Sequence, residues 1–251
     1  MMVMGTHRFF VLPECIGEYK VSFDEEDSHH IKNVLRLNEG DVIEVCNGLG
    51  NLFEVKITSN ERNRVCGRIL KKVECKKGDD LRVTLFQAIL KGSKMDFVIQ
   101  KATEIGVVRI VPVFTERTVV DLQNGKDKKR LLRWKKITME ASKQSKRVTV
   151  PKIDDPMDLV ELPKVLSDFD RILIFWEDEK ERGIRDVLDS LKCSNVAIII
   201  GPEGGFSERE VNLVKGVGGK TVTLGDNILR AETAGLVASA IVLYELNALG
   251  T

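Results

Sequence analysis

The sequence predicts an α/β protein in which a small, mostly β domain precedes a larger domain of alternating strands and helices. Two observations support this expectation. Short stretches of alternating apolar and polar residues fill the chain to about residue 75, and beyond that point apolar strands alternate with amphipathic helices. The change of pattern predicts domains at residues 1–73 and 74–251, joined by the charged segment "ECKKGDD" at 74–80.

The first domain contains several short strands and one helical or turn segment. A strand is expected at "RFFV" (8–11), and "VIEVCNGLGNLFEVKI" (42–57) is typical of two strands joined by a turn rich in glycine and asparagine. "RVCGRILKKV" (64–73) predicts a further strand. "DEEDSHHIKNVLRL" (24–37) predicts the helical segment, so the domain is mostly β.

The second domain alternates strands with helices, which favours a mostly parallel sheet. Strands are expected at residues 81–90, 107–114, 171–176, 196–201 and 220–224. Ser93 is expected to cap a helix that Gly106 ends, and a long basic helix covers about 128–143. Ser207 and Glu210 form a capping-box pattern that predicts another helix. The closing segment, "AETAGLVASAIVLYELNAL" (231–249), predicts a helix that is apolar on most faces and therefore buried in a core or between subunits.

Composition excludes several classes of protein. The chain has 251 residues and a formal net charge of +1, so any nucleic-acid binding must come from local patches. Its five cysteines are scattered and its three histidines lie far from the later acidic motifs, so neither a metal site nor a disulfide framework is expected. The apolar runs are too short to span a membrane, and no signal peptide is visible. We expect a cytoplasmic protein.

A glycine-rich turn follows the apolar strand in "IIIGPEGGFSEREV" (198–211) and leads into the helix after Ser207. It lacks the lysine of a phosphate-binding Walker loop and the glycine spacing of a dinucleotide fingerprint. Glu203 also places a carboxylate in the turn, where it would repel a phosphate. The loop therefore suits a neutral or cationic ligand, unless it is only a tight turn that needs glycine for its dihedral angles.

A second loop, "LGDNILRAETA" (224–234), likewise follows a short strand and precedes a helix. Ligands of open α/β sheets bind at the carboxyl ends of the strands, so the two loops are expected to line one pocket. The alternative for Arg230 and Glu232 is a solvated pair at a helix start.

These two loops together resemble the signature pair of the RsmE family, which methylates N3 of a uridine in 16S ribosomal RNA. That family belongs to the SPOUT superfamily of knotted methyltransferases. The likeness extends over nearly the whole chain, through "HRFFV", "HHIKNVLRLNEGD", "QKATEIGV" and "MEASKQSKR", in the order that the family has them. One departure is Asn227, which occupies the place of a usual arginine and puts that arginine's role in doubt.

The resemblance implies an N-terminal PUA-like β-barrel that binds RNA and a SPOUT-type α/β domain with a C-terminal trefoil knot. It also implies S-adenosylmethionine as the cofactor and a homodimer, whose interface we expect to include Ala238 or Val242 of the closing helix. The expected cofactor-binding residues are Glu177, Gly201, Glu203, Gly204, Gly205, Leu224, Gly225, Ile228 and Leu229. We expect valine at position 204 to fill space that the nucleoside needs.

The candidate catalytic residues are Arg230, which would stabilise negative charge on the uracil, and Glu203 or Glu232, which would accept the N3 proton. Glu232 has an alternative role in orienting Arg230. The segment 126–147 contains ten basic residues against two acidic ones, which favours RNA binding, although an exposed helix face is the ordinary explanation of a charge run. The candidate RNA-binding residues are Arg8, Arg36, Lys135, Lys143, Gln144 and Arg147.

Two alternative functions stay open at the level of sequence. The first is a SPOUT methyltransferase that acts on transfer RNA or on a ribose 2′-hydroxyl. The second is a non-catalytic RNA-binding factor for ribosome assembly, which the intact glycine loop disfavours and Asn227 leaves possible.

Overall fold

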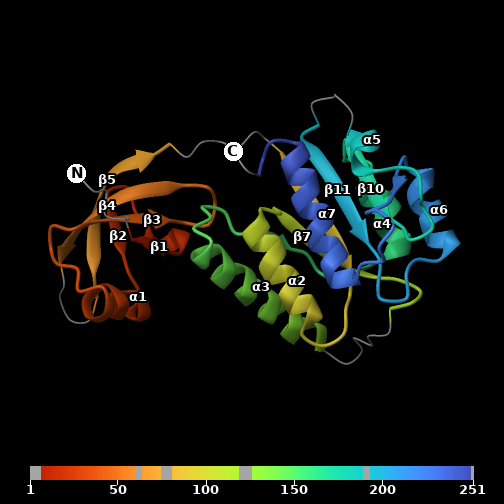
Figure 1. Cartoon of the computed structure of the whole chain (residues 1–251). Coiled ribbons are helices and arrows are strands. Elements are labelled where there is room, and N and C mark those ends of the chain that lie inside the picture. The colour runs from red at the N-terminus through yellow and green to blue at the C-terminus, as the bar shows by residue number, and fades with distance from the viewer. Residues whose placement is uncertain (1–6, 60–63, 75–80, 119–125, 189–192, 250–251) are drawn as a thin grey trace. The chain divides into compact units, whose positions relative to one another are not determined.

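The computed structural model describes residues 7–59, 64–74, 81–118, 126–188 and 193–249 (Figure 1). The chain forms two compact units. The first consists of Met1–Lys76 together with Ser142–Val150, and the second of Lys77–Ala141 together with Pro151–Thr251. The expected joint at 74–80 lies almost wholly outside the described residues. No helix in the described part of the chain is long and apolar enough to cross a membrane.

The first unit contains a five-stranded sheet in the order β1-β3-β4-β5-β2, in which β1 and β3 are parallel and the other pairs antiparallel. The expected strands and the short helical segment are present. The strands that the structure describes run from β1 at one edge to β2 at the other, so this PUA-like sheet is a half-barrel. Its elements are β1 (Arg8–Phe10), η1 (Pro13–Cys15), β2 (Lys20–Ser22), α1 (Glu25–His29), the π-helical η2 (His30–Val34), β3 (Val42–Cys46), β4 (Leu52–Ser59) and β5 (Cys66–Val73).

A distant segment, residues 142–150, completes the first unit. Gly50 N donates to the carbonyl of Val148 at 3.0 Å, and Val150 N donates to the carbonyl of Gly48 at the same distance. Leu49 and Thr149 form an antiparallel bridge between these two bonds. The chain therefore returns to the first unit after the long basic helix, which the change of sequence pattern near residue 75 did not predict.

The second unit is built on a parallel sheet in the order β12-β10-β11-β6-β7-β8, with β9 also pairing with β7. Its strands are β6 (Arg82–Ala88), β7 (Arg109–Phe114), β8 (Lys152–Ile153), β9 (Met157–Asp158), β10 (Arg171–Phe175), β11 (Asn195–Ile200) and β12 (Lys220–Val222). Its helices are α2 (Lys94–Ile105), α3 (Lys126–Gln144), η3 (Leu159–Glu161), α4 (Leu162–Leu166), α5 (Ile184–Leu188), α6 (Glu208–Gly216) and α7 (Ala231–Glu245). The last three residues of α3 belong to the first unit.

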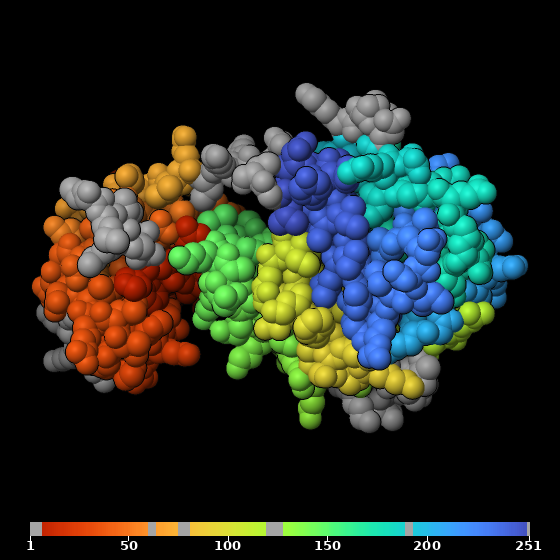
Figure 2. Space-filling view, in the orientation of Figure 1, coloured from red at the N-terminus to blue at the C-terminus, as the bar shows by residue number. Residues whose placement is uncertain are grey.

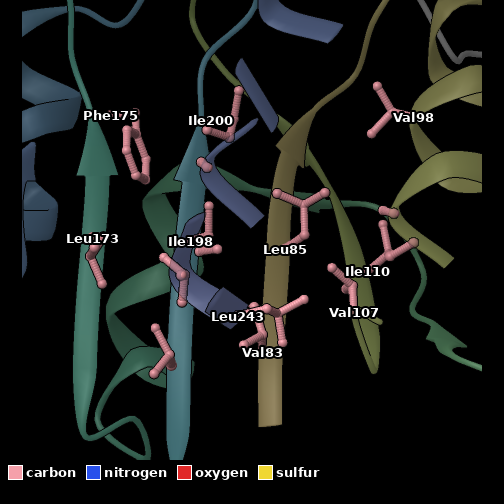
Figure 3. Packing of buried hydrophobic residues seen from close by; sticks show 14 of the residues in the cluster. Val83, Leu85, Val98, Val107, Ile110, Leu173, Phe175, Ile198, Ile200 and Leu243 are labelled. Atoms are coloured by element: carbon pink, nitrogen blue, oxygen red, sulfur yellow. The ribbon is translucent and has the colours of Figure 1, made fainter. Parts of the chain in front are cut away.

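Successive strand residues point to opposite faces of this sheet, and each face has its own apolar core. Val196, Ile198 and Ile200 pack with α2, α5 and α7, whereas Ala197 and Ile199 pack with α4 and α6. Figure 3 shows side chains of the first core projecting from neighbouring strands. Burying each large aliphatic side chain stabilises the folded protein by about 1.5–3 kcal/mol. These two apolar layers therefore hold together the sheet that carries the site.

Of the residues expected to begin or end helices, two behave as predicted and one does not. The Ser207 and Glu210 capping box is present, and Gly106 ends α2 with φ at +126° as expected. The expectation for Ser93 was wrong in its mechanism, since Ser93 precedes α2 but its side chain makes no capping hydrogen bond. The backbone of Ser93 is already near-helical, with ψ at −3°, instead of extended as a capping serine requires.

The closing helix buries the two residues that we expected at a subunit interface, so that expectation was wrong. Ala238 and Val242 are fully buried in the core of their own chain. The outer side of α7 instead presents Ile241 and Tyr244, whose exposed fractions are 36% and 62%. A helix that packs on a sheet and on α2 must turn its small residues inward, because they permit the closest approach of the backbones.

Candidate functional site

Three loops at the carboxyl edge of the parallel sheet enclose a cavity of about 530 Å³. They follow β10, β11 and β12, which are neighbours in the sheet, so their carboxyl ends lie together. The cavity lies entirely within the second unit. This is the position at which open α/β sheets bind their ligands.

The cavity contains every residue that the sequence singled out as cofactor-binding, together with the candidate catalytic Arg230. The glycine loop and the Leu224–Arg230 loop both contribute to its lining, and Glu177 comes from the third strand as expected. Glu232, in the first turn of α7, contacts the cavity through an ion pair with the lining residue Lys94. The lining residues that were predicted are Glu177, Gly201, Glu203, Gly204, Gly205, Leu224, Gly225, Ile228, Leu229 and Arg230.

The glycine loop favours glycine at position 205 because of its backbone conformation. Its φ of +70° lies in the left-handed region, which side chains disfavour. A Cβ atom there would also lie 2.0 Å from Oε1 of Glu177, so that carboxylate would have to move. At Gly204, by contrast, a Cβ would first meet the side chain of Arg117 at an ordinary 3.4 Å, and no neighbour would be displaced.

Residues far away in sequence anchor the glycine loop. The buried carboxylate of Glu210 accepts hydrogen bonds from Ser207 N at 2.9 Å and from Glu116 N at 2.8 Å. Arg117 donates to the carbonyl of Gly204 at 2.8 Å. The capping box predicted only the Ser207 bond. The contacts of Glu116 and Arg117 depend on how β7 places the loop that follows it.

The second loop is held by hydrogen bonds among its own residues and those of α7. Gly225 N donates to Oγ1 of Thr223 at 3.1 Å, and Gly225 has φ at +102°. Ile228 is 89% exposed, the most exposed large apolar side chain in the described residues. The Arg230 carbonyl accepts from two amides of the first turn of α7, which places its side chain at the start of that helix.

The loop after β10 is fixed by a charged cluster. Thr221 donates its hydroxyl to Oε2 of Glu179 at 2.5 Å, and backbone amides 181 and 182 donate to Oε1. The Thr221 bond and these amides lower the pKa of Glu179 to about 2, against the effect of burial. Lys180 donates to the Glu177 carbonyl at 2.6 Å, so the same cluster holds the backbone of Glu177.

Lys94 is the residue that sequence reasoning missed. Its ammonium lies 3.1 Å from Oε1 of Glu203 and 3.4 Å from Oε2 of Glu232. The bond to Glu203 raises the pKa of Lys94 against the effect of burial. Burial raises the pKa of Glu203, but its own backbone amide and Lys94 outweigh this and hold that pKa below its usual value. The available signal was that Lys94 follows the carboxyl end of β6, the strand beside β11.

The candidate RNA-binding residues fall into two groups. Lys135, Lys143 and Gln144 are exposed on α3, and Arg36 is exposed near η2. Figure 2 shows part of α3 at the surface.

Arg8 and Arg147 also serve the first unit itself. Arg8 forms an ion pair with Glu44 at 2.7 Å and donates to the carbonyl of Lys146. Arg147 is half-buried, and burial lowers its pKa to about 10. Arg8 therefore helps to hold the segment 142–150 in place, and Arg147 is partly enclosed by its own unit.

No cluster of His, Cys, Asp and Glu that could hold a metal ion occurs among the described residues. The cavity instead offers three cations, three carboxylates, backbone groups and apolar side chains. Such a lining can bind a cationic ligand with an apolar ring, and can hold or accept a proton near the start of α7.

Comparisons with known proteins agree with this geometry. Residues 77–243 match the family model described as an RNA methyltransferase domain, and residues 23–70 match an RNA methyltransferase PUA domain. Ribosomal RNA small subunit methyltransferase E of Bacillus subtilis is 34% identical over 89% of this chain and 90% of its own. The protein of the same name from Rickettsia conorii is 33% identical over 85% of each chain.

Two solved structures share the fold over nearly the whole chain. The small subunit methyltransferase E of Neisseria gonorrhoeae, bound to S-adenosylmethionine, is 32% identical with a TM-score of 0.81, covering 96% of this chain and 98% of its own. A methyltransferase of Legionella pneumophila with the same bound cofactor is 30% identical, again with a TM-score of 0.81 and the same coverage. The cavity at the carboxyl edge of the sheet and the match over both units place the chain in one family: it belongs to the RNA methyltransferases of the ribosomal RNA small subunit methyltransferase E type.

Proposed function

We propose that this protein transfers the methyl group of S-adenosylmethionine to N3 of a uridine in 16S ribosomal RNA. The observation that carries the proposal is that all nine predicted cofactor residues line one cavity. Relatives named as small subunit ribosomal RNA methyltransferases support the substrate class, and two solved methyltransferases with this cofactor bound support the methyl donor. A protein that modifies ribosomal RNA would act in the cytoplasm.

The residues present fit S-adenosylmethionine. The cofactor carries a sulfonium cation and no phosphate, and the cavity places Glu203 inside the loop where a phosphate would be repelled. The apolar side chains of Phe175, Ile200 and Leu224 can contact an adenine ring. A volume of about 530 Å³ is also in the range of ordinary cofactor sites. When bound, the cofactor supplies an activated methyl group.

Methyl transfer is an in-line displacement, in which the new bond from carbon to N3 forms as the bond from carbon to sulfur breaks. The protein therefore has to align the uracil nitrogen with the methyl group and the sulfur. Arg230, at the cavity wall, would stabilise the negative charge that develops on a uracil oxygen as N3 loses its proton. Both actions require the nucleotide to be turned out of its stack.

The N3 proton must pass to a carboxylate of the protein. Glu203 and Glu232 both lie within 3.4 Å of Lys94. The lowered pKa of Glu203 makes it a weak proton acceptor. We favour Glu232, which the structure pairs with Lys94 instead of Arg230 and which is the less exposed of the two carboxylates.

RNA would be held by the basic side of α3. Its exposed lysines can contact phosphates, which position an RNA without reading its sequence. Lys135 and Lys143 are the strongest candidates because both are exposed and belong to this helix. The exposed lysines of α3 whose side chains the structure describes are Lys128, Lys129, Lys135, Lys136 and Lys143.

We also infer a two-fold homodimer, the commonest closed symmetry of soluble oligomers. The outer side of α7 supports this, since Ile241 and Tyr244 leave apolar surface uncovered there. Figure 2 shows part of α7 at the surface. The interface would use these residues, and not Ala238 or Val242, whose side chains are occupied within their own chain.

One experiment tests the proposed function. Ribosomal RNA from cells with and without the gene is digested and analysed by mass spectrometry, and purified protein is then supplied with small-subunit RNA and labelled S-adenosylmethionine. We expect one N3-methyluridine to be lost without the gene and restored by the protein. A methyl group on a ribose or on transfer RNA would indicate the other SPOUT activities. Absence of any cofactor binding would favour the assembly factor instead.

A further inference from the structure

Lys94 connects three segments that lie far apart in the sequence. It is the first residue of α2, whereas Glu203 belongs to the glycine loop and Glu232 to the first turn of α7. The ammonium of Lys94 lies 3.1 Å from Oε1 of Glu203 and 3.4 Å from Oε2 of Glu232. The first of these contacts joins residues 109 positions apart.

The placement of Lys94 is not explained by α2 itself. A cation at a helix N-terminus is unfavourable, because the amide groups of the first turn carry partial positive charge. Glu232 supplies a reason for the placement. Its side chain is only 13% exposed and its Oε2 atom is buried, so the carboxylate needs a compensating positive charge. Among the described residues, Lys94 supplies this positive charge through its ion pair with Glu232.

We propose that Lys94 is a positioning residue that ties the glycine loop to the first turn of α7 and thereby fixes both the width of the cofactor cavity and the orientation of Glu232. The inference rests on the proposed function and deepens it. Glu203 lies within the loop that forms one wall of the cavity, and Arg230 and Ala231 at the start of α7 form part of the other. Loss of the ammonium would leave two carboxylates facing each other across this gap, where they repel.

The test compares Lys94→Met, Lys94→Arg and Lys101→Met. Lys101 is a matched control, because it is a lysine of the same helix with similar exposure whose ion pair, to Glu104, is made within α2. Calorimetry gives the affinity for S-adenosylmethionine, and steady-state methyl transfer to small-subunit RNA gives kcat and the KM for RNA separately. We expect Lys94→Met to weaken cofactor binding about tenfold and to lower kcat while the KM for RNA stays close to that of the wild type, with most of both effects restored in Lys94→Arg.

A double-mutant cycle separates positioning from general damage to the fold. If Lys94 acts through Glu232, Lys94→Met should weaken cofactor binding less in a Glu232→Gln background than in the wild type. Should Lys94→Met fail to fold in thermal unfolding, Lys94→Gln replaces it in every measurement. Wild-type cofactor affinity and an unchanged kcat in the folded variant would overturn the inference. A wild-type protein that binds no S-adenosylmethionine would instead overturn the proposed function.

Discussion

Glu177 and Gly205 occupy neighbouring positions in the cavity wall, and each restricts what the other can be. The carboxylate of Glu177 fills the space into which a Cβ at position 205 would project. The positive φ of Gly205 adds a backbone restriction at the same point. Glycine at position 205 therefore leaves room for the Glu177 side chain as well as for a ligand.

We expect Gly205→Ala to weaken S-adenosylmethionine binding by at least about tenfold and to destabilise the protein by about 1–2 kcal/mol. The methyl group would displace the Glu177 carboxylate and strain the loop. Calorimetry and thermal unfolding measure the two effects. Gly216→Ala is the control, because a Cβ there meets nothing within 4 Å and φ is ordinary. Unchanged cofactor affinity in Gly205→Ala would show that the loop does not form the site.

The lowered pKa of Glu179 predicts how the stability of the loop after β10 changes with pH. Its pKa of about 2 in the folded protein is below the ordinary value of 4.5, chiefly because Thr221 donates to it. Folding is therefore favoured by its ionised form above about pH 4.5, and this contribution disappears as pH falls from there toward about 2. Replacing Glu179 with Gln should cost about 1–2 kcal/mol at pH 7 and less at pH 3.

Urea unfolding at several pH values measures this difference, with the exposed Glu181→Gln as the control. The gap between wild type and Glu179→Gln should narrow steadily below pH 4.5. A gap of equal size at pH 3 and pH 7 would mean that the carboxylate charge contributes nothing to the loop.

At the scale of the elements, α3 combines a buried seam with a basic surface. Trp134 and Thr138 are buried, whereas Lys135 and Lys136 are exposed on the other side of the helix. Burial of the seam fixes the rotation of the helix, so the lysines have to face solvent. Arg147, beyond the end of α3, is half-buried in the first unit, and a charge reversal there would disturb folding as well as RNA binding.

Reversing the charge of both Lys135 and Lys143 should weaken RNA binding and leave cofactor affinity unchanged. The slope of log affinity against log salt should fall by about 0.7 to 0.9 for each phosphate that the protein no longer neutralises. Lys164→Glu with Lys215→Glu is a matched control, since these are exposed lysines of α4 and α6 on the other face of the sheet. An unaltered salt slope in the Lys135 and Lys143 variant would mean that this surface is only a solvated helix face.

At the scale of the whole molecule, the proposed association of two copies of the chain depends on α7. Its inner side packs on α2, β6 and β11, and its outer side carries Ile241 and Tyr244. The same helix begins at Arg230, so an interface along it would bring a second copy close to the cavity. Assembly and activity are therefore expected to depend on the same surface.

We expect Ile241→Glu to halve the mass in solution and to lower methyl transfer, because a carboxylate would be buried in an apolar interface. Light scattering at the assay concentration measures the mass. Val160→Glu is the control, since Val160 is also an exposed apolar residue but belongs to η3 on the other face of the sheet. A wild-type monomer with full activity would contradict the dimer.

The sequence by itself determined the longer strands and helices of both units and the loops that form the cavity, but not the short elements β2, β8, β9, α4 and α5. Period-two and helical patterns are local, as are the Ser207 capping box and the glycines of the loop after β11. The cofactor residues could be predicted because they lie in short loops that directly follow parallel strands, where ligands of such sheets bind. The trefoil knot stays a prediction, because it belongs to the path of the whole chain and leaves no local pattern.

Only the tertiary structure decided which distant groups meet at the cavity and which sides of the helices are buried. Lys94 reaches Glu203 because β6 lies beside β11, and Arg117 reaches Gly204 because β7 lies beside β6. The closing helix is apolar all round, so its pattern could not show that Ala238 faces inward and Ile241 outward. Packing against the sheet and α2 determines which residues of this helix face inward. The contacts at the cavity join residues 87 or 109 positions apart, so they depend on strand order and not on the residues beside them in the sequence.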